Sequence, residues 1–146
     1  ESREGSVAQD VLLSFRSLRV KDTHPYLVVA RQQPNSLRMT QAMSSVEDAV
    51  RAVSGITEAT SIFDDRDRIA MPDETLRFGL GTDRDKALLL HVLAEHLLGR
   101  LGGRVEVRTL LGDSRSFVQI GELLFDAGSC QRVSQPSEPI WIELGN

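Results

Sequence analysis

The chain has 146 residues, of which 40% are hydrophobic and 26% charged, with a formal net charge of −4. These values are typical of one globular domain with a single core, and the acidic balance argues against nucleic-acid binding. The single cysteine, Cys130, excludes an internal disulfide and is expected to be structural. No apolar run reaches membrane-spanning length, so we expect no direct membrane insertion by this segment.

We expect residues 1–146 to form a single domain, with a flexible polar lead over residues 1–9. The chain begins at Glu1 without a methionine, which suggests a domain excised from a larger protein. Residues 10–20 fit a short helix and a strand equally well, and the secondary structure of residues 10–43 as a whole stays open.

Two short patterns can nevertheless be interpreted within that region. Residues 26–30 (YLVVA) are typical of a short strand, and His24-Pro25 is expected to break whatever precedes them. The triplet Pro34-Asn35-Ser36 is typical of a turn.

The first predicted helix covers residues 46–53. Ser44 or Ser45 is expected to cap it, Ser45 and Asp48 have capping-box spacing, and Gly55 is expected to end the helix. Its apolar residues recur at helical spacing and are expected to face a core.

Residues 57–78 are mostly polar and are expected to form a lead-in to the next helix. They contain an acidic cluster, Asp64, Asp65 and Asp67. This cluster lacks the alternating oxygen ligands, the central glycine and the final glutamate of a calcium loop. We therefore expect a solvated loop or a helix start there.

The most apolar helix of the chain is predicted within residues 79–98 (GLGTDRDKALLLHVLAEHLL). Thr82 or Asp83 can act as its N-cap, Thr82 and Asp85 have capping-box spacing, and Gly99 is a suitable residue just past its end. Because apolar residues cover nearly its whole circumference, the helix is expected to be buried at the centre of the fold.

Arg84, His91 and Glu95 form one narrow polar stripe on that helix. His91, Glu95 and His96 do not have the spacing of a zinc-binding helix, so we expect a surface stripe and no metal site. No cofactor is predicted.

Four strands are predicted after the helix, over residues 104–111, 115–120, 123–126 and 140–144. Short glycine-containing turns separate the first three, which predicts an antiparallel meander. A buried central helix packed on an antiparallel meander is an α+β fold.

The order of these parts resembles the core of the transglutaminase-like, papain-like cysteine-protease superfamily. The helix start Gly81–Leu90 is similar to the family pattern G-x-C-x-(D/E)-x-A-x-L-L. Residues 115–120 (RSFVQI) resemble its H-A-(W/F)-V-(E/Q)-(V/I) strand, Phe125-Asp126 its strand ending in Asp, and Gly103-Arg104-Val105 its joint before the first strand. The resemblance covers about residues 79–127 and implies a transglutaminase-like core.

The departures from the family decide what the resemblance implies for function. Asp83 stands where the family has its nucleophilic Cys, Arg115 stands where it has its His, and only Asp126 matches the triad. An arginine stays protonated and cannot act as a general base near neutral pH. The resemblance therefore implies a pseudoenzyme.

We expect Asp83 and Arg115 to form a charge-assisted pair, shared with Asp126. If that pair is buried, breaking one side would cost about 3–5 kcal/mol. The alternative is that Arg115 points to solvent and that the strand register is shifted by one residue.

The leading hypothesis is a non-catalytic module for interaction, sensing or scaffolding within a larger, membrane-associated protein, with a protein or peptide as partner. The expected peptide cleft is lined by Gly81, Thr82, Asp83, Phe117 and Trp141. An alternative is an enzyme with altered chemistry, in which Asp83 and Asp126 form a carboxylate pair and Arg115 an electrostatic clamp. A third interpretation is an anion site at the Gly79–Thr82 turn.

Overall fold

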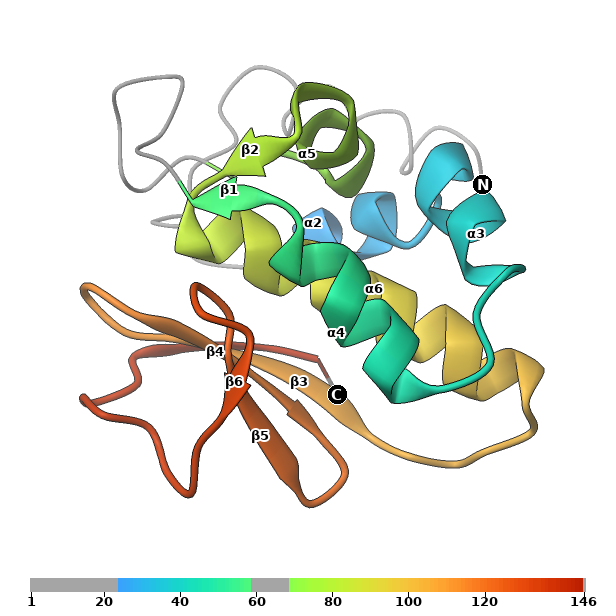
Figure 1. Cartoon of the computed structure of the whole chain (residues 1–146). Helices are drawn as coiled ribbons and strands as arrows, with labels where there is room; N and C mark the ends of the chain where they lie inside the picture. The colour runs from blue at the N-terminus through green and yellow to red at the C-terminus, as the bar shows by residue number, and fades with distance from the viewer. Residues whose placement is uncertain (1–23, 59–68, 146) are drawn as a thin grey trace.

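The computed structural model describes residues 24–58 and 69–145 (Figure 1). Its helices gather in one layer, and a sheet built from the C-terminal part of the chain forms the second layer (Figure 1). The expectations for residues 1–9, for residues 10–20 and for the acidic cluster Asp64, Asp65 and Asp67 lie outside the described residues.

The described elements follow one another as helices first and strands second. In chain order they are α2 (His24–Ala30), α3 (Pro34–Thr40), α4 (Val46–Ser54), β1 (Thr57–Glu58), α5 (Pro72–Phe78), β2 (Leu80–Gly81), α6 (Asp83–Arg100), β3 (Val107–Leu111), β4 (Ser116–Ile120), β5 (Leu123–Asp126), β6 (Gln131–Arg132) and β7 (Ile142–Leu144). None of the helices in this described part is both long and apolar enough to cross a membrane.

The main sheet is antiparallel, with the strand order β6-β5-β4-β3-β7. Strands β3, β4 and β5 are the predicted meander, and β7 returns to pair with β3 on the other side. The short strands β1 and β2 form a separate parallel pair. The predicted α+β fold, with a central helix packed on an antiparallel meander, is confirmed.

Helix α6 is buried on more than one side, as its all-round apolar pattern predicts. One side packs with α4 and with the inner face of the sheet, where Leu93, Val118 and Phe125 share a cluster. Another side packs with α2 and the other sheet edge, through Leu88 and Val92. The helix is therefore the element that holds the two layers together.

The predicted strand over residues 26–30 is wrong, because these residues belong to helix α2. Tyr26 and Leu27 are 1% exposed and pack against α6. Burial against a helix thus outweighs the strand preference of the β-branched run that follows them.

The predicted turn at Pro34 is also wrong, since Pro34 begins helix α3. Proline suits the first position of a helix, where the missing N–H would have no partner in any case. The backbone N–H groups of Asn35 and Ser36 instead donate to the carboxylate of Asp73 at 3.0 and 2.8 Å. Asp73 lies in α5, a helix that the sequence pattern missed and that likewise begins at a proline.

Helix α4 is confirmed at nearly the predicted bounds. Asp48 accepts a hydrogen bond from the backbone N–H of Ser44 at 2.9 Å, and Gly55 follows the last helical residue. The side chain of Ser45 makes no capping bond, and Asp48 instead accepts from the backbone N–H and the hydroxyl of Ser44, one residue earlier than the predicted capping box.

Candidate functional site

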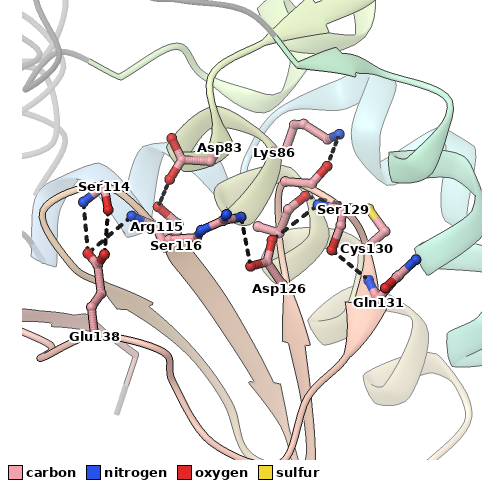
Figure 2. A network of polar contacts seen from close by, with 12 residues as sticks. Asp83, Lys86, Ser114, Arg115, Ser116, Asp126, Ser129, Cys130, Gln131 and Glu138 are labelled. Atoms are coloured by element: carbon pink, nitrogen blue, oxygen red, sulfur yellow. Dashed lines mark hydrogen bonds and ion pairs between the residues drawn. The ribbon is translucent and has the colours of Figure 1, made fainter.

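The positions singled out by the family resemblance do come together in space. Helix α6 begins at Asp83, strand β4 begins just after Arg115, and strand β5 ends at Asp126. Figure 2 shows these three residues around the point where the helix start faces the sheet. We call this place the helix–sheet junction.

The start of α6 is fixed by the predicted capping box. The Oγ1 of Thr82 accepts from the backbone N–H of Asp85 at 3.1 Å, and the Asp85 carboxylate accepts from the N–H of Thr82 at 3.0 Å. Asp85 also accepts from the backbone N–H of Ala70 at 2.8 Å. Burial raises the pKa of the Asp85 carboxyl, although its hydrogen bonds with Ala70 and Thr82 oppose that shift.

The same capping box affects whether the Gly79–Thr82 turn can bind an external anion. The N–H of Thr82 already donates to the carboxylate of Asp85, which is part of this chain. A negatively charged side chain therefore occupies the place that an external anion would take, and the geometry gives that interpretation no support.

Four consecutive charged residues, Asp83 to Lys86, are buried in the first turn of α6, with exposed fractions between 1% and 6%. The Nη2 of Arg84 donates to the carbonyl of Gly112 at 3.1 Å, and the Nζ of Lys86 donates to the carbonyl of Gly128 at 2.8 Å. These two contacts reach the β3–β4 turn and the β5–β6 turn, which lie at the same end of the sheet. The charged first turn therefore ties α6 to the sheet.

The expected ion pair between Asp83 and Arg115 is wrong. The Asp83 carboxylate accepts from the Oγ of Ser116 at 2.7 Å, whereas the guanidinium of Arg115 lies 3.4 Å from the carboxylate of Asp126 (Figure 2). Ser116 shares a strand face with Val118, which packs in the α6 cluster.

The side chain of Arg115 is 56% exposed, and Ser116 is fully buried. Ser116 thus faces the helix start in place of Arg115, which agrees with a shift by one residue, whereas Arg115 is not free in solvent but pairs with Asp126, as the first expectation included. Ser116 is the residue that the motif comparison missed. It lies two residues before Val118 and four before Ile120, and this alternation is the signal that would have identified it.

Asp126 also organises the turn that follows β5. Its carboxylate accepts from the backbone N–H of Ser129 at 3.1 Å, and its carbonyl accepts from the N–H of Cys130 at 2.7 Å. Cys130 is buried, and burial raises the pKa of its thiol against the opposing effect of nearby Lys86. A thiol with a raised pKa holds its proton and is a poor nucleophile.

Four of the five residues expected to line a peptide cleft are buried in this arrangement of the chain. Gly81 is buried, and Thr82, Asp83 and Phe117 are 4%, 6% and 1% exposed. Thr82 and Asp83 are closed in by the cap and the sheet contact, and Phe117 lies on the strand face opposite to Ser116. Only Trp141 is exposed, at 42%, and its ring lies 5.5 Å from the guanidinium carbon of Arg84.

The predicted surface stripe on α6 is also wrong. His91 is fully buried, and its Nδ1 lies 2.8 Å from the Oγ1 of Thr109 on β3. Its Nε2 lies 3.2 Å from the Glu95 carboxylate, a close polar contact rather than a well-aligned hydrogen bond. Arg31, beyond the end of α2, donates two hydrogen bonds to Glu95 at 2.8 and 2.9 Å.

This chain of contacts, which we call the His91 network, joins β3, α6 and the end of α2 through Thr109, His91, Glu95 and Arg31. Its members are engaged with one another. Among residues 24–58 and 69–145, no group of three or more His, Cys, Asp and Glu side chains is arranged to hold a metal ion.

The register at the helix–sheet junction gives a direct prediction. Ser116→Ala is expected to lower the free energy of unfolding by about 1–3 kcal/mol, because it removes a buried donor from a buried carboxylate. Arg115→Ala is expected to cost less than about 1 kcal/mol, because its ion pair with Asp126 is half exposed. Urea unfolding of both variants measures the difference, and a larger loss for Arg115→Ala would place that residue at the helix.

Searches of family models, of curated proteins and of solved structures found no match to this chain.

Proposed function

We propose that this chain is a non-catalytic module of the transglutaminase-like type, which acts through contacts with protein or peptide partners. The observation that carries the proposal is the pairing at the helix–sheet junction. Asp83 is hydrogen-bonded to Ser116, and Arg115 is paired with Asp126. Each of the three motif residues therefore makes a contact that joins one element of the fold to another.

The chemistry of these groups supports a structural use of the junction. A nucleophile needs a basic partner in contact with it, and an arginine next to Asp126 stays protonated. The hydroxyl of Ser116 is fully buried, and it donates to a carboxylate rather than to a stronger base. Cys130, with its raised thiol pKa, is likewise poorly suited to attack a carbonyl.

The alternative of an Asp83/Asp126 carboxylate pair gains no support from this geometry. Such a pair needs one carboxyl that keeps its proton near neutral pH. In the described structure, Asp83 accepts from the hydroxyl of Ser116 and Asp126 is paired with Arg115, so these contacts lead the two carboxylates to different partners.

A contact function finds support at the edges of the sheet. In the described part of the chain, β7 pairs only with β3 and β6 pairs only with β5. A strand paired on one side presents backbone groups to which an extended peptide can add. Trp141, half exposed immediately before β7, is the type of side chain that anchors such contacts.

Two measurements on the whole chain test the proposal. In assays of amide hydrolysis and of transamidation, we expect no turnover that depends on Asp83 or Asp126, and the variants Asp83→Asn and Asp126→Asn serve as the comparison. In selection from a displayed library of random peptides, we expect enrichment of a common sequence. Turnover that either variant abolishes would overturn the non-catalytic role, and a selection without enrichment would overturn the contact role.

A further inference from the structure

A groove lies between helix α4 and the β6 edge of the sheet. It has a volume of about 270 Å³, and it is lined by Glu47, Val50, Arg51, Leu123, Phe125 and Arg132. We call it the α4–β6 groove. Its volume is just below the range of about 300–1,000 Å³ that is usual for small-molecule sites, so it suits one apolar side chain of a larger partner.

The two walls of the groove are set by regular secondary structure. Glu47, Val50 and Arg51 are three and four positions apart on α4, so they share one side of that helix. Across the groove, Phe125 and Arg132 are direct partners in the β5–β6 ladder, so their side chains point to the same face of the sheet.

The groove has an apolar floor and a charged rim. Val50, Leu123 and Phe125 provide the apolar surface, and Phe125 continues into the main core cluster. The rim carries Glu47 and two arginines, which gives a local charge of +1 on a chain whose net charge is −4.

Both arginines have capacity for a further anionic partner. The side chain of Arg51 is 76% exposed, and its ion pair with Asp48 is long, at 3.4 Å. None of the ion pairs among residues 24–58 and 69–145 involves Arg132, which is exposed on the two-residue edge strand β6.

We propose that the α4–β6 groove binds an extended acidic peptide segment of a partner protein. An apolar side chain of the segment lies on the floor formed by Val50, Leu123 and Phe125, and carboxylates on either side of it pair with Arg51 and Arg132. The backbone of the segment runs beside β6, whose outer side has no strand partner in the described structure. The inference rests on the proposed contact function and assigns it a surface and a partner chemistry.

Binding of an acidic peptide distinguishes the proposed docking role of Arg132 from a purely protective role. An arginine on an edge strand can also act only to prevent two sheet edges from pairing. That protective role predicts no saturable binding of an acidic peptide. The proposed role requires that binding depends on both the arginines and the apolar residue of the peptide.

The test is a titration of the whole ¹⁵N-labelled chain with a capped Glu-Asp-Leu-Asp-Glu peptide, followed by backbone amide shifts. We expect saturable shifts centred on Val50, Leu123 and Arg132. The variants Arg51→Glu and Arg132→Glu are each expected to raise Kd by about threefold to tenfold, since an exposed charge pair becomes a repulsive one. Arg38→Glu, the same charge change on the exposed surface of α3, is expected to change Kd by less than about twofold.

Two comparison peptides complete the experiment. Replacing the central leucine by glycine, or the four acidic residues by lysine, is expected to abolish saturable shifts. Equal binding of all three peptides, or equal Kd values for the three arginine variants, would overturn the proposal. Library-selected peptides that shift amides elsewhere on the chain would overturn the groove assignment and leave the contact function standing, whereas a library without any binder would overturn both.

Discussion

Replacing Asp85 by alanine is expected to lower the free energy of unfolding by about 2–4 kcal/mol. The Asp85 carboxylate accepts from the backbone N–H groups of Ala70 and Thr82 at 2.8 and 3.0 Å, and all of these atoms are buried. Alanine leaves both N–H groups without an acceptor, and each buried unsatisfied group costs about 1–3 kcal/mol. Burial raises the pKa of this carboxyl, and the hydrogen bonds that it accepts from Ala70 and Thr82 oppose that shift.

Urea unfolding at neutral pH measures this loss, and Asp48→Ala is the matched control. Asp48 also accepts a backbone hydrogen bond at the start of a helix, from Ser44 at 2.9 Å, but that contact is exposed. Water replaces the lost acceptor there, so the control is expected to cost much less than Asp85→Ala. If both variants lowered the free energy of unfolding by the same amount, the Asp85 carboxylate would not be buried with its two N–H donors.

The parts of the fold that the sequence predicts well are those whose signals are long or repeated. Helix α6 has an all-round apolar pattern over many residues and a correct capping box, whereas its predicted end before Gly99 is wrong, because the helix continues to Arg100. The meander has alternating strands between short turns, and β5 has the predicted bounds, Leu123–Asp126. Such signals survive because local preference and tertiary packing favour the same structure.

The parts that were mispredicted are short. Helices α2, α3 and α5 each have seven residues, too few for a periodic pattern to emerge. Two of them begin at prolines that a pattern search interprets as breaks, Pro34 and Pro72. Their stability comes from contacts with α6 and with one another, such as the Asp73 carboxylate at the start of α3. That information lies in residues far away in the sequence.

The candidate site divides in the same way. The motif order correctly placed Asp83 at the start of α6 and Asp126 at the end of β5, because both positions depend on element boundaries. The partner of Asp83 depends on strand register, and one residue decides whether Arg115 or Ser116 faces the helix. The motif over residues 115–120 begins just before β4, so it does not by itself show which of its first two residues faces the helix.

The His91 network shows the same limit over a longer distance. On a helical wheel, His91 and Glu95 look like an exposed pair one turn apart. They are covered because Thr109 and Arg31 approach them from β3 and from the end of α2. His91 and Glu95 thus have polar partners, Thr109 and Arg31, that the helix sequence does not contain.

This network predicts a loss of stability in acid. Burial of Glu95 opposes its ionisation, but polar contacts with His91 and with Arg31 outweigh that effect and lower its pKa from 4.5 to about 2. A carboxyl with a lowered pKa in the folded state stabilises the fold above its unfolded pKa. That contribution is lost as the pH falls from about 4.5 toward about 2.

The variant Glu95→Gln isolates this contribution. A full shift of this size corresponds to about 3 kcal/mol, and because the Glu95 side chain is 21% exposed we expect about 1–2 kcal/mol. Urea unfolding of the parent chain and of the variant at pH 6, 4 and 2.5 should show a difference in stability that shrinks as the pH falls. Glu143→Gln, which removes an exposed carboxylate 3.7 Å from Arg108, should give a small difference at every pH. If the curves of the parent chain and of Glu95→Gln ran parallel, Glu95 would keep an ordinary pKa, and the contacts of the His91 network would not stabilise its charge.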